Sequence, residues 1–321
     1  MTDISLIGRV HGTCFPAPVL AAALLFTPAS VQAFSVDGDM TVNIQGHEDG
    51  MLIADHFNVV DGTHFGEAEL PRPQSMHLPS FQDLPVGRGL TSGGSQPSAS
   101  FAAESSGFFI MEPPPDDEQH SYDIQSQLLW SATVAHQNTA SQAYELNLAI
   151  DPIELRLWDG ADPPLTWEAG YSILVSVDGT SVWFSEAEIE GNMNGVTLRQ
   201  FGTNLSATGV NLPPPGGQVP SELIGYDFDP HSETIPLATL DSLGDSFDLS
   251  VMVTTSISDV PNTETGAYAL IGDPAGGDPG INATVIPEPG TYALLGGAGA
   301  LLLVIARRHT KRAKAGGSSA V

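Results

Sequence analysis

Four segments of the chain alternate between apolar and polar residues with a period of two. The apolar positions are Leu128, Trp130, Ala132 and Val134; Tyr144, Leu146, Leu148 and Ile150; Tyr171, Ile173, Val175 and Val177; and Phe247, Leu249, Val251 and Val253. Successive side chains of a strand point to opposite faces of its sheet, so this pattern predicts half-buried strands of antiparallel sheets. No segment between residues 34 and 286 shows a long helical period. We therefore expect an all-β fold, an antiparallel β-sandwich with jelly-roll-like connections.

Asp178-Gly179 separates two alternating runs, and this dipeptide favours a two-residue hairpin turn. The turn would pair Val177 with Thr180 and Val175 with Val182. Continuing in the same phase would bury three glutamates, so we expect a bulge or a strand end near Ser185. The residues expected to turn inward after it are Ala187 and Ile189.

Changes of composition divide the chain into segments. Residues 34–106 include a long Pro-, Gly- and Ser-rich stretch from residue 70, and we expect a loosely structured region that contributes some strands, such as one over residues 40–45. Residues 107–270 are expected to form the sandwich, interrupted by Pro-rich loops at residues 111–120 and 211–220. Residues 271–285, IGDPAGGDPGINATV, predict a flexible linker.

Residues 1–33 have the three parts of a secretory signal peptide. A mostly polar start containing Arg9 precedes the apolar run FPAPVLAAALLF, and Val31 and Ala33 are small residues two positions apart. We expect signal peptidase to cleave after Ala33. The alternative is a buried helix of the fold, which two prolines at the start of the apolar run disfavour.

The C-terminal segment predicts a membrane helix followed by a basic cluster. Residues 291–306 carry no charge. This uncharged run is slightly shorter than the ~20 residues that span a typical bilayer as a helix. The basic residues that follow are Arg307, Arg308, Lys311, Arg312 and Lys314. Such a cluster remains on the cytoplasmic side and stops transfer, so residues 34–286 would lie on the outer side of the membrane.

Pro287-Glu288-Pro289 stands directly before the apolar run. The sequence IPEPGTYALLGG, followed by LLVIARR, resembles the PEP-CTERM sorting signal of Gram-negative bacteria over about the last 36 residues. The resemblance implies that residues 286–314 are recognised by exosortase, a membrane transpeptidase or protease. That enzyme removes the helix and passes the rest of the protein to the cell surface or to extracellular polysaccharide. Pro287, Glu288 and Pro289 would be the recognition residues, and residues 315–321 a tail.

The charge of the chain is strongly negative. It has 38 acidic residues, 10 Lys and Arg, and a net charge of -28; between residues 34 and 286 there are 36 acidic residues and only four basic ones. Such a surface attracts cations and repels phosphate backbones, which argues against nucleic-acid binding. The single cysteine, Cys14, would leave with the signal peptide, so the exported protein would have no disulfide and no thiolate.

No nucleophile elbow, zinc-protease, P-loop, dinucleotide-binding or EF-hand motif occurs in the sequence. Pairs of carboxylates are uninformative in so acidic a chain, so we assign no catalytic residue. The best candidates for metal ligands are His47, Glu48, Asp55, His56, Asp61 and His64. Their spacing is not diagnostic of a metal site, so we assign no metal and no cofactor.

Two Asp-x-Asp pairs, Asp37/Asp39 and Asp227/Asp229, leave calcium open as a ligand, although we prefer the explanation that they are solvated turns. Three tryptophans are candidates either for a sugar-stacking platform or for the core. These are Trp158, Trp167 and Trp183. Trp130 is in phase with Leu128 and Val134, so we expect it in the core.

Three classes of function remain open. The first is an exosortase-sorted protein with a structural or interaction role in the polysaccharide envelope, the second a lectin-like carbohydrate-binding module, and the third a secreted glycan-active enzyme. We expect the first, because no catalytic signature supports the third. The protein would be anchored transiently in the inner membrane and then reside at the cell surface or in the extracellular matrix.

Overall fold

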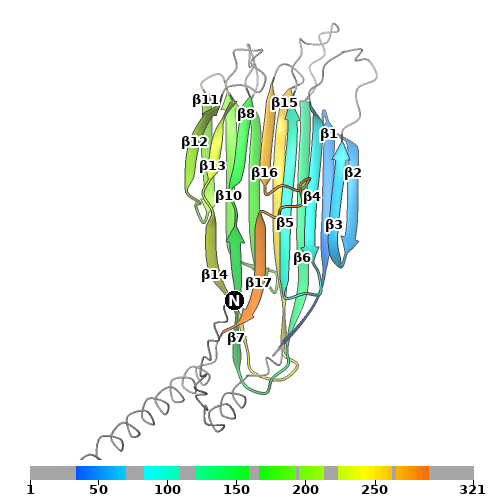
Figure 1. Cartoon of the computed structure of the whole chain (residues 1–321), viewed down its shortest axis with the longest axis vertical. Coiled ribbons are helices and arrows are strands. Elements are labelled where there is room, and N and C mark those ends of the chain that lie inside the picture. Colours follow the sequence, from blue (N-terminus) through cyan, green and yellow to red (C-terminus); the bar gives the residue numbers. More distant parts are fainter. Residues whose placement is uncertain are drawn as a thin grey trace, which may run out of the picture. The chain divides into compact units, whose positions relative to one another are not determined.

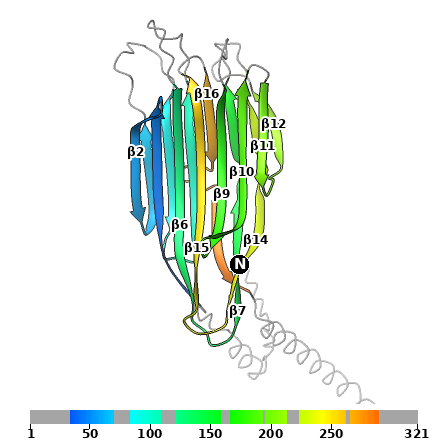
Figure 2. The ribbon, with the colours of Figure 1, turned by 180° about the vertical axis from the view of Figure 1, so that it is seen from behind.

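A computed structural model describes residues 34–69, 83–108, 121–158, 166–192, 195–212, 223–261 and 265–288. All the regular secondary structure of these residues is β-strand, in two antiparallel sheets (Figure 1). The first sheet, seen from its own side in Figure 2, has the order β11-β10-β9-β15-β6-β1-β2. Its strands are β1 (Phe34–Glu48), β2 (Met51–Val60), β6 (Ser121–His136), β9 (Trp167–Val177), β10 (Thr180–Asn192), β11 (Gly195–Gly202) and β15 (Ser246–Pro261).

The second sheet contains the other ten strands. They are β3 (Gly62–Glu69), β4 (Asp83–Gly93), β5 (Ser98–Phe108), β7 (Gln142–Ile150), β8 (Ile153–Trp158), β12 (Ala207–Leu212), β13 (Leu223–Phe228), β14 (His231–Leu240), β16 (Gly266–Ile271) and β17 (Ile281–Pro287). β16 and β17 both pair with β5, one along each half of it, so together they act as one interrupted strand. On the side away from β5, β16 pairs with β8 and β17 pairs with β7.

The core lies between the two sheets. All sixteen apolar residues of the four alternating segments are buried, which confirms the predicted strands β6, β7, β9 and β15. They belong to one continuous hydrophobic cluster that draws on both sheets. The indole Nε1 of Trp130 donates a hydrogen bond to the carbonyl oxygen of Gly94 at 2.9 Å, which ties β6 to the end of β4. The all-β, antiparallel prediction is therefore confirmed.

The β9–β10 hairpin has the predicted turn but an earlier bulge. Thr180 pairs with Val177 as expected, yet the register shifts between Ser181 and Trp183, so Trp183 rather than Val182 lies opposite Val175. Val182 is the extra residue of the bulge, and after it the side chains of β10 point to the opposite faces from those expected. The bulge lies three positions before Ser185, where we expected it. Its physical basis is Trp183, whose large ring is buried while Val182 remains exposed. Ala187 and Ile189 are buried, as predicted.

The described parts of residues 34–106, expected to be a loosely structured region with some strands, form the strands β1 to β5, and the expectation is corrected for these parts. β1 pairs with β6 along its whole length, and β4 and β5 fill residues 83–108, part of the stretch expected to be an irregular loop. The inward positions of β5 hold small residues, such as Ala99, Ala103 and Ser105, around the buried Phe101. Small residues give a weak hydrophobic pattern in the sequence although they pack well where the sheets lie close together.

The expected linker at residues 271–285 is also corrected. Its last part, residues 281–285, belongs to β17, an interior strand between β5 and β7 that buries Ile281, Ala283 and Val285. Its first half is a short loop closed at its base, where Asp273 and Asp278 exchange backbone hydrogen bonds of 2.8 and 2.9 Å. The loop leaves the sheet between β16 and β17 and returns to it, so it adds no freedom to the chain end.

Among the described residues there is no helix of the length and hydropathy that a membrane span requires. The predicted signal peptide, the apolar run at residues 291–306 and the basic cluster after it lie outside the described residues. The Pro-rich stretches at residues 111–120 and 213–220 lie outside them as well.

Candidate functional site

β17 carries the predicted sorting element out of the sheet. Pro287 is the last residue of the strand and lies opposite Tyr144 of β7. The amide of Glu288 donates to the carbonyl oxygen of Ala143 at 2.9 Å, and Gln142 Nε2 donates to the carbonyl oxygen of Glu288. The first two residues of the element are therefore held by the folded domain. Pro289 lies outside the described residues, as do Val31 and Ala33 and the basic residues Arg307, Arg308, Lys311 and Arg312.

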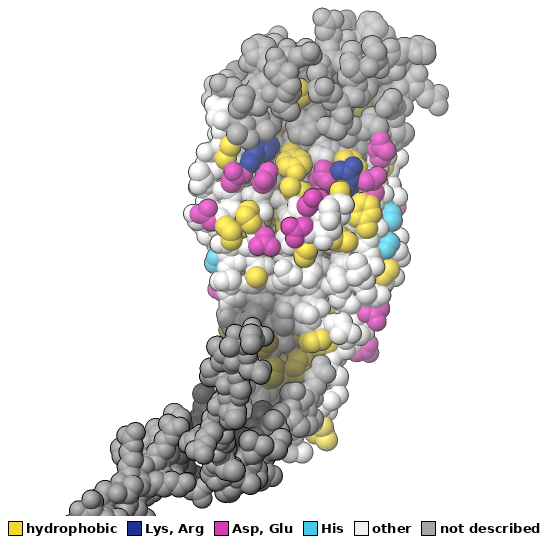
Figure 3. All heavy atoms as spheres, viewed as in Figure 1, with side chains coloured by type: hydrophobic (Ala, Val, Ile, Leu, Met, Phe, Trp, Pro, Cys, Tyr) yellow, Lys and Arg dark blue, Asp and Glu magenta, His cyan; other side chains and the backbone are white. Residues whose placement is uncertain are grey.

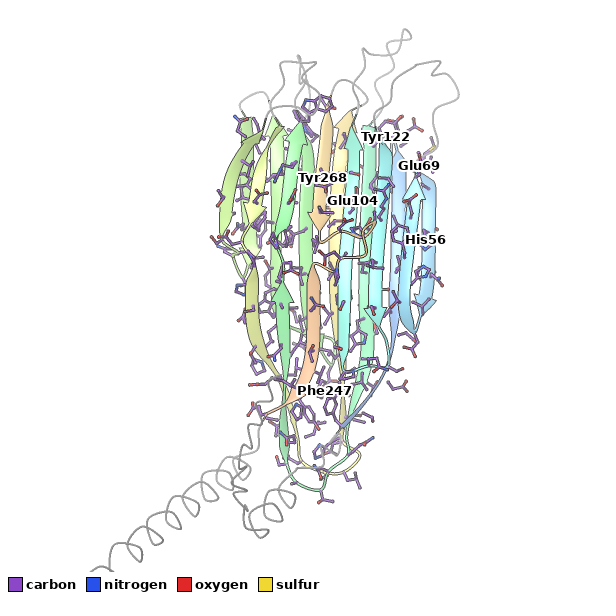
Figure 4. All side chains as sticks on the ribbon, in the orientation of Figure 1. His56, Glu69, Glu104, Tyr122, Phe247 and Tyr268 are labelled. Atoms are coloured by element: carbon purple, nitrogen blue, oxygen red, sulfur yellow. The ribbon has the colours of Figure 1, made fainter. Side chains whose placement is uncertain are left out.

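Tyr144 joins several elements at this end of the sandwich by packing and a hydrogen bond. It is buried, and its ring packs edge-on against Phe34 and Phe247, with centroids 5.6 and 5.9 Å away. Its hydroxyl lies 2.7 Å from Nδ1 of the buried His136. Burial raises the pKa of the Tyr144 hydroxyl. Figure 4 shows Phe247 at the end of the sheets where β7 and β17 meet.

An open groove of about 470 Å³ lies on the outer face of the seven-stranded sheet. Its lining brings together the carboxylates of Asp37, Asp39 and Asp248 with the hydroxyl groups of Ser131, Thr133 and Ser250. These side chains form two rows across the sheet, because Asp37 and Asp248 both lie opposite Thr133, while Asp39 and Ser250 both lie opposite Ser131. Such a surface offers many acceptors and several donors to a polyhydroxylated ligand.

The groove is fixed by contacts along its floor and rim. Thr133 Oγ1 donates to Asp248 Oδ1 at 2.8 Å, and the amide of Asp248 donates to Asp178 Oδ1 at 2.9 Å. Gly38 separates the two aspartates of β1, and a Cβ atom there would lie 2.4 Å from the carbonyl oxygen of Ser131. β1 and β6 therefore approach so closely that only glycine fits at this point.

Three glutamates gather on the same face of the sheet, toward β10. Glu168, Glu188 and Glu190 each place a carboxylate oxygen within 4.8 Å of the others. Arg199 of β11 lies 3.4 Å from Glu188 and 2.5 Å from Glu190, so part of the charge is compensated. Burial and the neighbouring Glu168 raise the pKa of Glu188, and Arg199 opposes that rise. Carboxylate oxygens suit calcium, but here an arginine already occupies the cluster.

The histidine- and acid-rich stretch at residues 47–64 is spread over three strands, β1 and β2 of one sheet and β3 of the other. The structure brings His56 and His64 together, with their Nε2 atoms 3.2 Å apart. Glu48 accepts a hydrogen bond from Tyr122 Oη at 3.0 Å, and Asp61 Oδ1 accepts one from the amide of Ser95 at 3.1 Å. His47 and Asp55 take part in none of these three contacts. The candidate set therefore does not converge as a whole.

The second Asp-x-Asp pair does not form an open calcium site. Asp227 is in an ion pair with Arg156, and Asp229 Oδ2 accepts a hydrogen bond of 2.7 Å from the hydroxyl of Ser206. Phe228 between them is buried against Tyr171, with ring centroids 5.2 Å apart. The first pair, Asp37 and Asp39, lines the groove.

The tryptophans do not form a sugar platform. All four are buried, with Trp158 at 6% and Trp183 at 7% the most exposed. The Trp183 Nε1 donates to Glu233 Oε2 at 2.7 Å, which connects β10 to β14. Their rings therefore offer no free face for stacking. Trp130, Trp167 and Trp183 pack in the core, whereas Trp158 is buried outside that cluster, on the face of β8 that carries Glu154 and Arg156.

The outer face of the ten-stranded sheet carries basic side chains surrounded by acidic ones (Figure 3). Arg88 pairs with Glu67 at 2.7 Å and with Glu104 at 3.1 Å, and Arg156 pairs with Asp227 and lies 3.5 Å from Glu154. Burial, and then the charge of Glu104, raise the pKa of Tyr268, which lies between the two clusters. Arg88 and Arg156, the arginines described on this face, are thus each paired with carboxylates, which weakens their attraction for an anionic ligand.

Sequence reasoning missed most of the groove. Ser131, Thr133, Asp248 and Ser250 are ordinary polar positions of alternating strands, and only the register of β1, β6 and β15 shows that they are neighbours. No protein-family model, curated protein or solved structure matches the chain.

Proposed function

We propose that the chain is an exported β-sandwich protein that exosortase sorts to the cell surface or the extracellular matrix, where it has a structural or interaction role in the polysaccharide envelope. Its N-terminal signal peptide would be removed after Ala33, and its C-terminal helix would anchor it transiently in the inner membrane. Signal peptidase and exosortase would be its processing partners. The jelly-roll-like connections and the membrane helix remain predictions of the sequence.

One observation supports this proposal above the others: the last strand, β17, ends at Pro287, the first residue of the Pro-Glu-Pro element. Proteolysis beyond this element would remove none of the described strands. The buried side chains of β17 would stay with the released domain. A sorting signal that begins where the domain ends is what such processing requires.

The proposal is tested by altering the element and following the protein in its native host. The substitutions Glu288→Gln and Pro289→Ala should leave the protein in the membrane fraction and reduce the released form. Glu69→Gln, at an exposed position of β3, is the matched control and should be released as the wild type is. Undiminished release of the Glu288→Gln, Pro289→Ala variant would contradict the proposal.

A second candidate function, carbohydrate binding, is favoured by the groove. Its three carboxylates and three hydroxyl groups are held by a sheet rather than by loops, so they are pre-organised for a polar ligand. Extracellular polysaccharide would be the ligand class, and calcium would be a bridging ion rather than a catalyst. This candidate and the first are compatible, because a sorted protein needs a means of staying in the matrix.

A further inference from the structure

Two histidines face each other where the margins of the two sheets meet. β2 is the last strand of the seven-stranded sheet, and β3 pairs only with β4 in the other sheet. A single residue, Asp61, joins them. His56 and His64 are half-buried, and each lies between exposed neighbours along its strand, as the alternation of a strand requires. Figure 4 shows His56 at this margin.

The two histidines and Asn58 lie in rows of the strands whose other members include apolar residues. In the same alternating rows, Ala54 and Val60 pack against the core and Ala68 belongs to it. Polar groups placed there lose hydration and need partners within the protein. His56 and His64 therefore cost stability unless the protein or a ligand satisfies their ring nitrogens.

The protein satisfies those nitrogens only in part. The two Nε2 atoms lie 3.2 Å apart, and Asn58 Nδ2 lies 3.2 Å from the Nε2 of His64. A neutral imidazole nitrogen either donates one proton or offers one lone pair. His64 Nε2 therefore has one proton or one lone pair for two neighbours, His56 Nε2 and Asn58 Nδ2, which both lie 3.2 Å away.

Space for the cluster is made by a glycine. Gly66 of β3 lies against the His56 ring, and a Cβ atom at this residue would be 2.6 Å from the ring's Nε2 and Cδ2 atoms. The ring planes of His56 and His64 are 19° apart with centroids separated by 5.5 Å, so the nitrogens lie in the gap between the rings. Packing thus directs both Nε2 atoms toward the same region.

We propose that His56 and His64 form a binding site for a transition-metal dication, with zinc as the representative ion. Two ligands at the ~2.0–2.1 Å bond length of a tetrahedral zinc ion stand about 3.3–3.4 Å apart, close to the separation of the two Nε2 atoms. The ion takes the place of the shared proton and uses both lone pairs. Asn58 turns its amide oxygen toward the ion, and water completes the coordination.

The ligand chemistry selects the class of ion. Imidazole nitrogen suits Zn²⁺, Cu²⁺ and Ni²⁺, whereas Ca²⁺ and Mg²⁺ prefer oxygen ligands. The strongly negative surface raises the local concentration of any cation without selecting among them. Because the ligands come from strands of different sheets, the bound ion joins the two margins and stabilises the folded state.

The test is a calorimetric titration of the metal-free, full-length protein with Zn²⁺, in a large excess of Ca²⁺ that occupies the surface carboxylates. We expect one zinc ion per chain whose affinity depends on this site, and at least a tenfold loss of affinity in His56→Gln and in His64→Gln. His231→Gln is the control, because His231 lies on β14 beside Glu233. Zinc should raise the melting temperature of the wild type and the control, and not that of the two site variants.

X-ray absorption at the zinc edge of the loaded wild type gives a readout that does not depend on the folding of any variant. Two imidazole ligands per zinc are expected. A zinc ion with oxygen ligands only, an affinity unchanged in His56→Gln and His64→Gln, or no zinc binding in the presence of calcium would each overturn the proposal.

Discussion

The amide of Glu288 donates a hydrogen bond of 2.9 Å to the carbonyl oxygen of Ala143, so the Pro-Glu-Pro element begins within the β-sheet rather than on a tether. A protease that binds this element in an extended form must take up the same backbone groups that β7 uses. Recognition therefore requires either that residues 287–288 separate from β7 or that the enzyme acts before β17 docks. Ends of strands open at low cost compared with the whole fold, which makes the first route accessible.

Ile281→Ala tests whether β17 belongs to the core. Ile281 is fully buried, so we expect a loss of about 2–5 kcal/mol in the free energy of unfolding, measured by denaturant titration. Ile286→Ala on the same strand is the control; its side chain is partly exposed, and the loss should be about 1 kcal/mol or less. Equally small losses of unfolding free energy in both variants would contradict the burial of β17 and favour a flexible linker at these residues.

Two tryptophans allow the hydrogen bond of Trp130 to be separated from its packing. Trp130 Nε1 donates to Gly94, whereas Trp167 Nε1 is buried without a partner among the described residues. Trp130→Phe leaves a carbonyl oxygen unsatisfied, and Trp167→Phe removes an unsatisfied N–H. We expect Trp130→Phe to be the more destabilising by about 1–2 kcal/mol in denaturant titrations. The reverse order would contradict the hydrogen-bond assignment.

The pH dependence of stability is expected to report on Glu188. Its pKa is raised in the folded state, chiefly by burial and by Glu168, so the folded state favours the protonated carboxyl. Its ionisation therefore destabilises the fold at neutral pH, and this penalty disappears as the pH falls through the raised pKa. Glu188→Gln should raise the melting temperature at pH 7. The corresponding gain in the free energy of unfolding should be less than about 1 kcal/mol, because solvent screens the cluster.

The gain from Glu188→Gln should vanish at acidic pH, where the wild-type carboxyl is itself protonated. Glu69→Gln, at an exposed position of β3, serves as the comparison and should change the melting temperature little at either pH. A gain that persists unchanged at acidic pH would show that lost charge repulsion is not its cause.

Carbohydrate binding in the groove predicts a specific loss of affinity. Asp248→Asn and Thr133→Val alter the row of the groove formed by Asp37, Thr133 and Asp248. Each should weaken binding to the host's extracellular polysaccharide about tenfold or more, measured by affinity electrophoresis. Thr41→Val, on β1 outside the groove, should bind as the wild type does. Equal binding by all variants would remove the groove as the site.

The sequence predicted the strands that bury large residues on one face. β6, β7, β9 and β15 alternate between large apolar and polar side chains, and burial of the apolar set makes their facing unambiguous. β4 and β5 were missed because Ala, Ser and Gly fill their positions, and such residues carry little hydrophobic signal. β17 alternates through Ile281, Ala283 and Val285, but its flanking Gly and Pro residues favoured a linker.

The candidate sites depended on register, which a single sequence does not contain. Asp37 and Asp248 are neighbours only through Thr133, and His56 meets His64 only because the chain crosses from one sheet to the other at Asp61. The bulge at Val182 depends on whether the side chain of Trp183 or that of Val182 fits the core. Each of these relations follows from three-dimensional packing rather than from local sequence pattern.

Intact-mass spectrometry of the protein from its native host, in membrane and released fractions, tests the proposed sorting most directly. We expect a released form that begins at Phe34 and ends close to Pro289, and that therefore keeps every strand through β17. A membrane-bound form that retains residues 291–321, with no shorter form released, would contradict the proposal and leave the C-terminal segment a permanent anchor.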